Sequence, residues 1–93
     1  MLYDAHNHLQ DERLDPWREQ ILPMLPQTGL AEMIVTGSCE EDWPAVAELA
    51  RRHAWIRPAF GLHPWYVKER TKDWATTLKQ HLVSHPRAVV GEI

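Results

Sequence analysis

The sequence has almost no cysteine and no long apolar run, and each shortage excludes a class of protein. The single cysteine, Cys39, excludes an internal disulfide and fits a reducing cytoplasm, where we expect the protein to be. The longest uncharged apolar stretches have about six residues, far short of the roughly 20 that a membrane-spanning helix needs. Residues Met1–His8 contain no basic region followed by an apolar one, so we expect no secretory signal.

An excess of positive charge is also missing. The 10 Lys and Arg residues stand against 13 Asp and Glu residues, which gives a net charge of −3. This negative net charge argues against a broadly basic nucleic-acid-binding surface, but not against an enzyme that binds phosphates through bound cations. A hydrophobic content of 44% and a charged content of 25% are ordinary for a soluble globular protein. At 93 residues, the chain is expected to form one domain at most.

Four short apolar runs are predicted to be strands, and three segments with helical spacing lie between them. The predicted strands are 2–5, 32–37, 56–61 and 88–93. The first helix is expected to begin with Asp15 as its cap and Pro16 at its first position. The second is expected to begin with a capping box of Ser38 and Glu41. The third repeats an apolar residue at every fourth position and ends near Pro86.

The alternation of apolar strands with single helices predicts an α/β fold with a parallel sheet. The strand starts are separated by about 29 residues on average, and eight such units would approach the ~250 residues of a TIM-type (β/α)8 barrel. The chain is therefore expected to be the N-terminal half of such a barrel. The alternative is a doubly wound sheet, which is built from the same alternation of strands and helices. Against that alternative, the turn HNHLQDERL after the first strand contains no glycine to cradle a phosphate.

Two histidines follow the first predicted strand at a spacing of two. On a strand, such a spacing places His6 and His8 on the same side. At the C-terminal end of a barrel strand, that side is the mouth where these enzymes place their active sites. Neutral imidazoles suit zinc and related divalent ions, so His6 and His8 are candidate metal ligands.

A carboxylate lies at the end of the fourth predicted strand. Burying Glu92 is costly unless a metal or a charged partner compensates it, and from this strand it would reach the same mouth. Its two oxygens can bridge two cations. The alternative is a solvated residue at a strand end.

The sequence FGLHPW follows the third predicted strand. His63 is placed to hydrogen-bond a phosphate or a leaving group, and Trp65 to stack on a base. The alternative is a loop histidine beside a packing tryptophan. The remaining histidines, at 53, 81 and 85, are expected to be surface or packing residues, and Cys39 a small buried residue with no base to activate it.

Taken together, the motifs DAHNHL, VTGS followed by DWPAVAELA, FGLHPW and VVGEI resemble those of the TatD family of metal-dependent hydrolases, which have amidohydrolase-like barrels. The resemblance covers all 93 residues but only the N-terminal part of a family member, so residues 1–93 are interpreted as a partial domain with four strands and three helices. It implies that His6 and His8 bind one divalent ion, that Glu92 bridges it to a second, and that His63 lies in the substrate pocket.

The resemblance also implies hydrolysis of phosphodiester bonds, with DNA as the expected substrate and two divalent ions (Zn, Mg or Mn) as cofactors. Two later histidines and a later aspartate of the family have no counterpart in this chain, so the catalytic residue is not identified and the 93 residues alone are expected to be inactive. The alternatives are an amidohydrolase that acts on an amide or ester, and a non-catalytic fragment or binding module. No oligomeric state is predicted.

Overall fold

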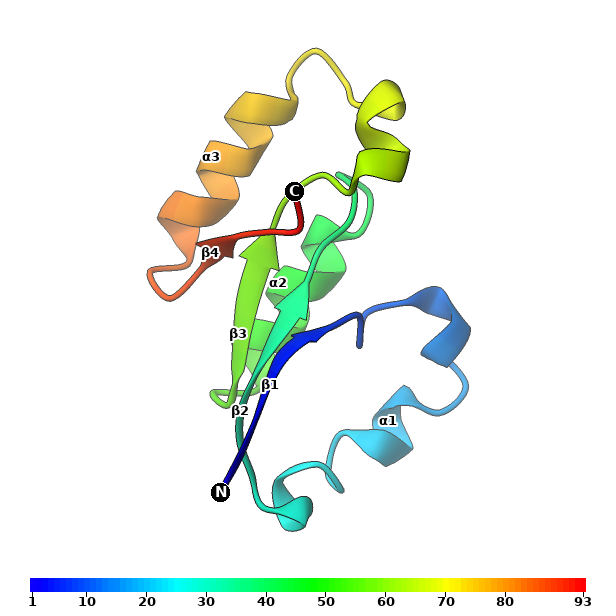
Figure 1. The fold of residues 1–93 in the computed structure, drawn as a ribbon, viewed down its shortest axis with the longest axis vertical. Coiled ribbons are helices and arrows are strands. Elements are labelled where there is room, and N and C mark those ends of the chain that lie inside the picture. The colour runs from blue at the N-terminus through cyan, green and yellow to red at the C-terminus, as the bar shows by residue number, and fades with distance from the viewer.

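The structure is a computed structural model that describes residues 1–93, and it contains a single four-stranded sheet with helices between the strands (Figure 1). The strands are β1 (Leu2–Asn7), β2 (Leu30–Thr36), β3 (Ile56–Phe60) and β4 (Val89–Val90). The α-helices are α1 (Arg18–Ile21), α2 (Trp43–Arg52) and α3 (Trp74–Ser84), and the 3-10 helices are η1 (Glu12–Leu14), η2 (Pro26–Thr28) and η3 (Pro64–Glu69).

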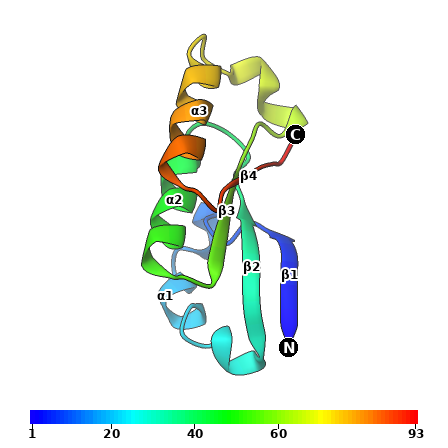
Figure 2. The same ribbon diagram turned by 90° about the vertical axis from the view of Figure 1, so that its left-hand side faces the viewer.

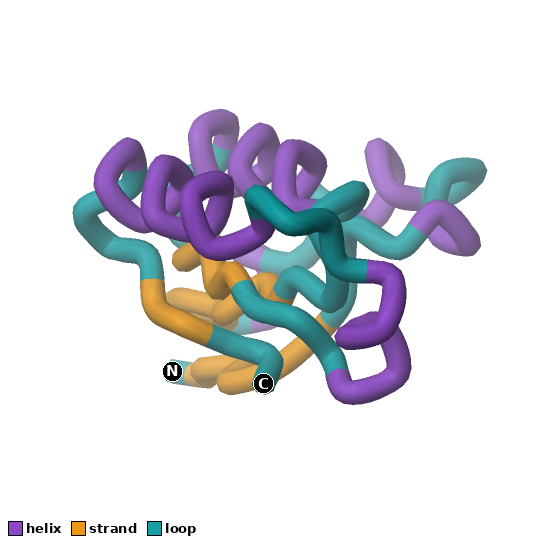
Figure 3. Tube along the Cα trace, turned by 90° about the horizontal axis from the view of Figure 1, so that it is seen from above, coloured by secondary structure: helices purple, strands orange, loops and turns teal.

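The strand order distinguishes between the two predicted architectures. All neighbouring strands are parallel, and their order in the sheet is β1-β2-β3-β4. A doubly wound sheet reverses its strand order and carries helices on both faces. Here the order never reverses, and the three α-helices lie on one face of the sheet (Figures 2 and 3). This arrangement confirms the predicted fold class, a part of a TIM-type barrel.

The capping residues predicted for the first and second helices are both wrong. Asp15 is not the N-cap of α1, whose N-cap position is occupied by Trp17. The Asp15 carboxylate accepts a hydrogen bond from Arg18, the first residue of the four-residue α1. The capping box of Ser38 and Glu41 does not form either, because α2 begins at Trp43 and Asp42 occupies the N-cap position. The Asp42 carboxylate reaches back to the backbone of the preceding loop instead of capping α2.

The two C-terminal elements match their predictions to different degrees. Helix α3 ends at Ser84, just before Pro86, as expected. The fourth strand is shorter than predicted, because only Val89 and Val90 pair with β3. The chain then leaves the ladder, and the backbone N–H of Glu92 donates to the carbonyl of Gly37 at 3.2 Å. Glu92 therefore lies beyond its strand and not within it.

The core lies between the sheet and its helices. Trp43, Val46 and Leu49 of α2 pack with buried strand residues such as Val35 and Phe60. His81 packs its ring on Phe60, with 4.7 Å between ring centroids, which agrees with the predicted packing role. The opposite face of the sheet carries no helix (Figure 3). No helix in the structure is both long and apolar enough to span a membrane.

Candidate metal centre

The residues singled out in the sequence lie at the carboxyl ends of three strands. His6 and His8 come from the end of β1, His63 follows β3, and Glu92 follows β4. Because the strands are parallel, their carboxyl ends lie at one edge of the sheet. The structure therefore brings together four residues that span nearly the whole length of the chain.

The carboxylate of Glu92 lies at the centre of this cluster. Its Oε2 atom lies 3.2 Å from His6 Nε2 and 3.5 Å from His8 Nε2. Its other oxygen, Oε1, lies 3.5 Å from His63 Nε2. The ligand atoms of His6, His8 and Glu92 all lie within 4.8 Å of one another. The two oxygens of Glu92 thus face different partners.

His8 presents an unprotonated nitrogen to the cluster. Its Nδ1 lies 2.8 Å from the backbone oxygen of Thr36. A carbonyl oxygen only accepts hydrogen bonds, so Nδ1 carries the proton. In the neutral ring, Nε2 then holds a lone pair, and it faces another electron-rich atom, Glu92 Oε2. A cation that both atoms coordinate would remove this repulsion.

His63 has the opposite tautomer. Its Nδ1 accepts a hydrogen bond from the backbone N–H of Trp65 at 3.0 Å, at the start of η3. The proton of the neutral ring therefore lies on Nε2, the atom that faces Glu92. His63 consequently presents a hydrogen-bond donor to the centre, whereas His8 presents an acceptor.

Three consecutive carbonyl groups at the end of β2 hold three of these residues. Thr36 accepts from the His8 ring, Gly37 accepts from the backbone N–H of Glu92 at 3.2 Å, and Ser38 accepts from the backbone N–H of His63 at 2.7 Å. The sequence does not indicate this role of residues 36–38 (the 36–38 segment), because backbone carbonyls leave no mark in a sequence. The spacing of Ser38 and Glu41 predicts a helix cap instead.

The cluster fits a divalent ion. Two donors at about 2.05 Å from a tetrahedral ion lie roughly 3.3 Å apart. The distances from Glu92 Oε2 to His6 and His8, 3.2 and 3.5 Å, bracket that value. Two imidazole nitrogens and a carboxylate oxygen are also a donor set that zinc uses in enzymes. The ring of His8 is oriented through its other nitrogen by a backbone carbonyl, as metal-bound histidines usually are.

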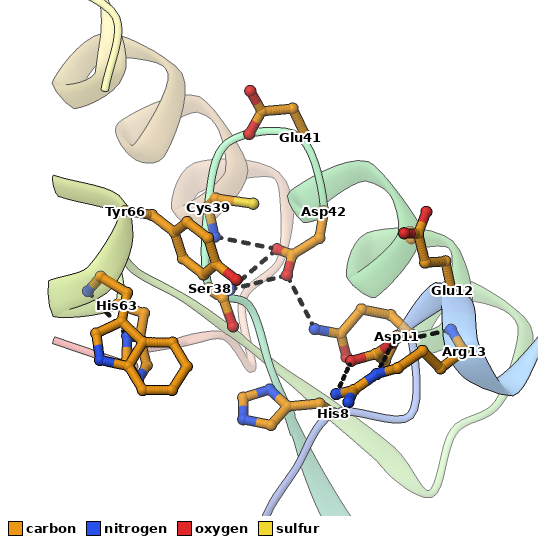
Figure 4. A pocket seen from close by; sticks show the side chains of 13 residues that line it. His8, Asp11, Glu12, Arg13, Ser38, Cys39, Glu41, Asp42, His63 and Tyr66 are labelled. Carbon is orange, nitrogen blue, oxygen red and sulfur yellow. Dashed lines mark hydrogen bonds and ion pairs between the residues drawn. The ribbon is translucent and has the colours of Figure 1, made fainter. Parts of the chain in front are cut away.

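A pocket of about 680 Å³ opens beside the cluster. Figure 4 shows His63 and Tyr66 on one side, Asp11 and Arg13 on the other, and His8 between them. Trp65 also lines the pocket, and 79% of its surface is exposed. The pocket is large enough for a small-molecule-sized ligand, such as a nucleotide.

The charged groups of the pocket are mostly acidic: Asp11, Glu12, Glu41 and Asp42 line it, with Arg13 as the basic side chain. The hydrogen bond from Arg13 lowers the pKa of Asp11 to about 2. Burial, followed by a hydrogen bond with Glu41, raises the pKa of the Cys39 thiol to about 11. Cys39 therefore stays protonated at neutral pH, in agreement with the prediction that it is not a nucleophile.

Comparison with known proteins adds an independent result. The family model described as TatD related DNase matches residues 3–93, nearly the entire chain. No curated protein matches the chain. The match runs through all four strands and includes every residue of the cluster. The chain belongs to the TatD family of metal-dependent hydrolases.

Proposed function

We propose that this chain carries part of the active site of a metal-dependent phosphodiesterase that cleaves DNA, within a larger cytoplasmic hydrolase domain. The observation that supports the proposal best is the position of Glu92. One of its oxygens faces the imidazoles of His6 and His8, and the other faces away from them toward His63. A carboxylate with two separately directed oxygens is suited to join two cations.

His6, His8 and Glu92 would hold the first divalent ion, and the free oxygen of Glu92 would contribute to a second. Zn, Mg and Mn are the candidates, since histidine favours zinc and carboxylate oxygens suit Mg and Mn. When bound, such ions neutralise phosphate charge and lower the pKa of the water that attacks it. The positive charge of the ions is needed all the more because the pocket has an acidic lining. Without the ions, Asp11 and Glu41 would repel a phosphodiester.

The remaining residues of the proposed site bind and orient the substrate. His63 Nε2–H points into the centre, where it can donate to a phosphate oxygen or to the leaving oxygen. Trp65 is exposed at the rim of the pocket, where its ring can stack on a base. Its orientation is linked to that of His63, because the two rings lie edge to face with centroids 4.8 Å apart.

The test is a substrate panel on the full-length protein that contains these 93 residues. The protein is stripped with a chelator and reloaded separately with Zn, Mg or Mn. Single-stranded DNA, double-stranded DNA, simple phosphodiesters, aryl esters and lactones are then assayed. We expect metal-restored cleavage of DNA and little turnover of esters. Turnover of esters or lactones without DNA cleavage would show an amidohydrolase, and no turnover of any substrate would favour a binding module.

A further inference from the structure

Gln10 is a buried polar residue just beyond β1, with only 7% of its surface exposed. Its side-chain amide nitrogen donates to the backbone oxygen of Thr36 at 2.8 Å and to Asp42 Oδ2 at 3.1 Å. Both partners are acceptors, so the orientation of the amide group is unambiguous. Gln10 thus uses both of its N–H groups to connect the end of β2 to the residue that precedes α2.

These contacts close a ring of hydrogen bonds around the 36–38 segment. Asp42 accepts from the backbone N–H of Ser38, with both oxygens at 3.0 Å, and from that of Cys39 at 3.4 Å (Figure 4). The ring runs from Thr36 through Gln10 and Asp42 to Ser38, and the backbone of the 36–38 segment closes it. The carbonyls that hold His8, Glu92 and His63 all belong to this segment.

The stability of the fold does not require the Gln10 amide. Its oxygen Oε1 is buried and has no hydrogen-bond partner, which is an uncompensated cost. If the side chain lost its amide, neither of its two acceptors would be left without a hydrogen-bond donor. The oxygen of Thr36 would still have the His8 ring nearby as a donor, although without Gln10 it would no longer be fixed in position, and Asp42 Oδ2 would still accept from Ser38 N. An apolar side chain of the same length would therefore satisfy the fold at least as well.

We infer that Gln10 and Asp42 are positioning residues, which hold the 36–38 segment so that His8 keeps its proton on Nδ1 and directs Nε2 toward Glu92. The inference rests on the metal centre of the proposed function for its purpose. The placement of the His8 proton can nevertheless be measured without any metal. The direct hydrogen-bond partner of a metal-bound histidine typically changes metal affinity by about 10–100-fold when it is removed, and here that partner is the Thr36 carbonyl, to which Gln10 also binds.

The experiment compares Gln10→Met, Asp42→Asn and the control Val46→Ala with the unmodified chain, all prepared as the full-length protein that contains these 93 residues. Gln10→Met keeps the length of the side chain and removes both donors. In Asp42→Asn, the remaining side-chain oxygen accepts from Ser38 N. The new amide nitrogen then faces the amide nitrogen of Gln10, and because both are donors, the hydrogen bond between the two side chains is lost and the ring opens. Val46 is fully buried in α2 and its side chain makes none of the hydrogen bonds of the ring, so its truncation reports destabilisation alone. Zinc affinity is measured by titration, the His8 tautomer by ¹⁵N NMR of the metal-free full-length protein, and stability by thermal unfolding.

For Gln10→Met and Asp42→Asn we expect zinc to bind at least about tenfold more weakly and the Nε2–H tautomer of His8 to become populated. Gln10→Met should melt no lower than the unmodified chain, whereas Val46→Ala should melt lower and keep its zinc affinity and tautomer. An unchanged tautomer and zinc affinity in both ring variants would overturn the inference and leave the proposed function standing. If the unmodified chain binds no zinc, the proposed metal centre fails, and the tautomer comparison still decides the role of Gln10.

Discussion

The backbone of Glu92 crosses Gly61 at a distance that excludes any side chain there. A Cβ atom built on Gly61 would lie 2.3 Å from the backbone oxygen of Glu92 and 2.8 Å from its nitrogen. This close approach lets the chain after β4 pass over the end of β3 and reach the carbonyl of Gly37, the residue that follows β2. The glycine that follows β3 therefore determines where the carboxylate of Glu92 lies.

A substitution at Gly61 tests this relationship. Gly61→Ala should displace Glu92 and lower zinc affinity by about tenfold or more, because the obstructing atoms are backbone atoms that cannot rotate away. Gly91→Ala is the matched control, since its added Cβ would meet only Ala59 Cβ, at 3.9 Å. Zinc titration of both variants is the measurement. Equal affinities would show that Glu92 is not held by this contact.

Glu92→Gln should leave the fold intact while bound metal and DNA hydrolysis are largely lost in the full-length protein. The amide keeps the shape of the side chain but removes the negative charge that faces His6 and His8. Metal content by elemental analysis and cleavage of a labelled oligonucleotide are the measurements. Glu48→Gln, on the exposed surface of α2, is a control for the loss of one charge. Ordinary turnover at full metal occupancy would identify Glu92 as a simple strand-end residue.

His63→Ala should separate catalysis from metal binding. Its Nε2–H is a donor and its Nδ1 is already used by Trp65 N, so we expect metal affinity to change by less than about threefold. Loss of a proton donor or phosphate contact should lower the rate of DNA cleavage by about 100-fold. His8→Ala, by contrast, should lose metal and activity together. A His63 variant that loses its metal would make His63 a ligand.

The stability of the full-length protein that contains this chain should fall as the pH drops, in part through His81. Burial against Phe60, with a smaller effect of His85, lowers the pKa of His81 below its ordinary value. The unfolded chain therefore takes up this proton first. The contribution of His81 is complete above pH ~6.5 and is lost as the pH falls through the folded-state pKa. Between pH 7.5 and 5.5, the melting temperature of His81→Gln should fall less than that of the unmodified chain. Lys79→Gln, on the same helix, should behave like the unmodified chain.

The isolated 93-residue chain should be inactive, and it should aggregate, dimerise or be partly unfolded. Strands β1 and β4 are both open edges of the sheet. Apolar side chains on these strands face solvent, with Tyr3 69% and Val90 51% exposed. Size-exclusion chromatography and a nuclease assay would test the prediction. A stable monomer that cleaves DNA at the rate of full-length relatives would contradict the partial-barrel interpretation.

The sequence by itself determined the features that depend on local spacing. Alternation of apolar runs with helical repeats indicated the α/β order, and the start and end of α3 followed from its four-residue repeat and from Pro86. The strand spacing and the position of each motif near the end of a strand predicted that His6, His8, His63 and Glu92 lie at one edge of the sheet. The same motifs led to the TatD family.

Only the tertiary structure decided how these residues are held. The tautomer of His8 depends on the carbonyl of Thr36, 28 residues away, and that of His63 on the backbone N–H of Trp65 in the turn that follows it. Such backbone groups are the same in every residue. Ser38 shows the same limit: its spacing from Glu41 is compatible with a capping box, yet α2 begins later, after Asp42. The Asp42 carboxylate binds the loop and Gln10 because the folded chain brings those donors within reach. Local pattern predicts which side chains carry the chemistry, whereas long-range hydrogen bonds set the direction in which each of them points.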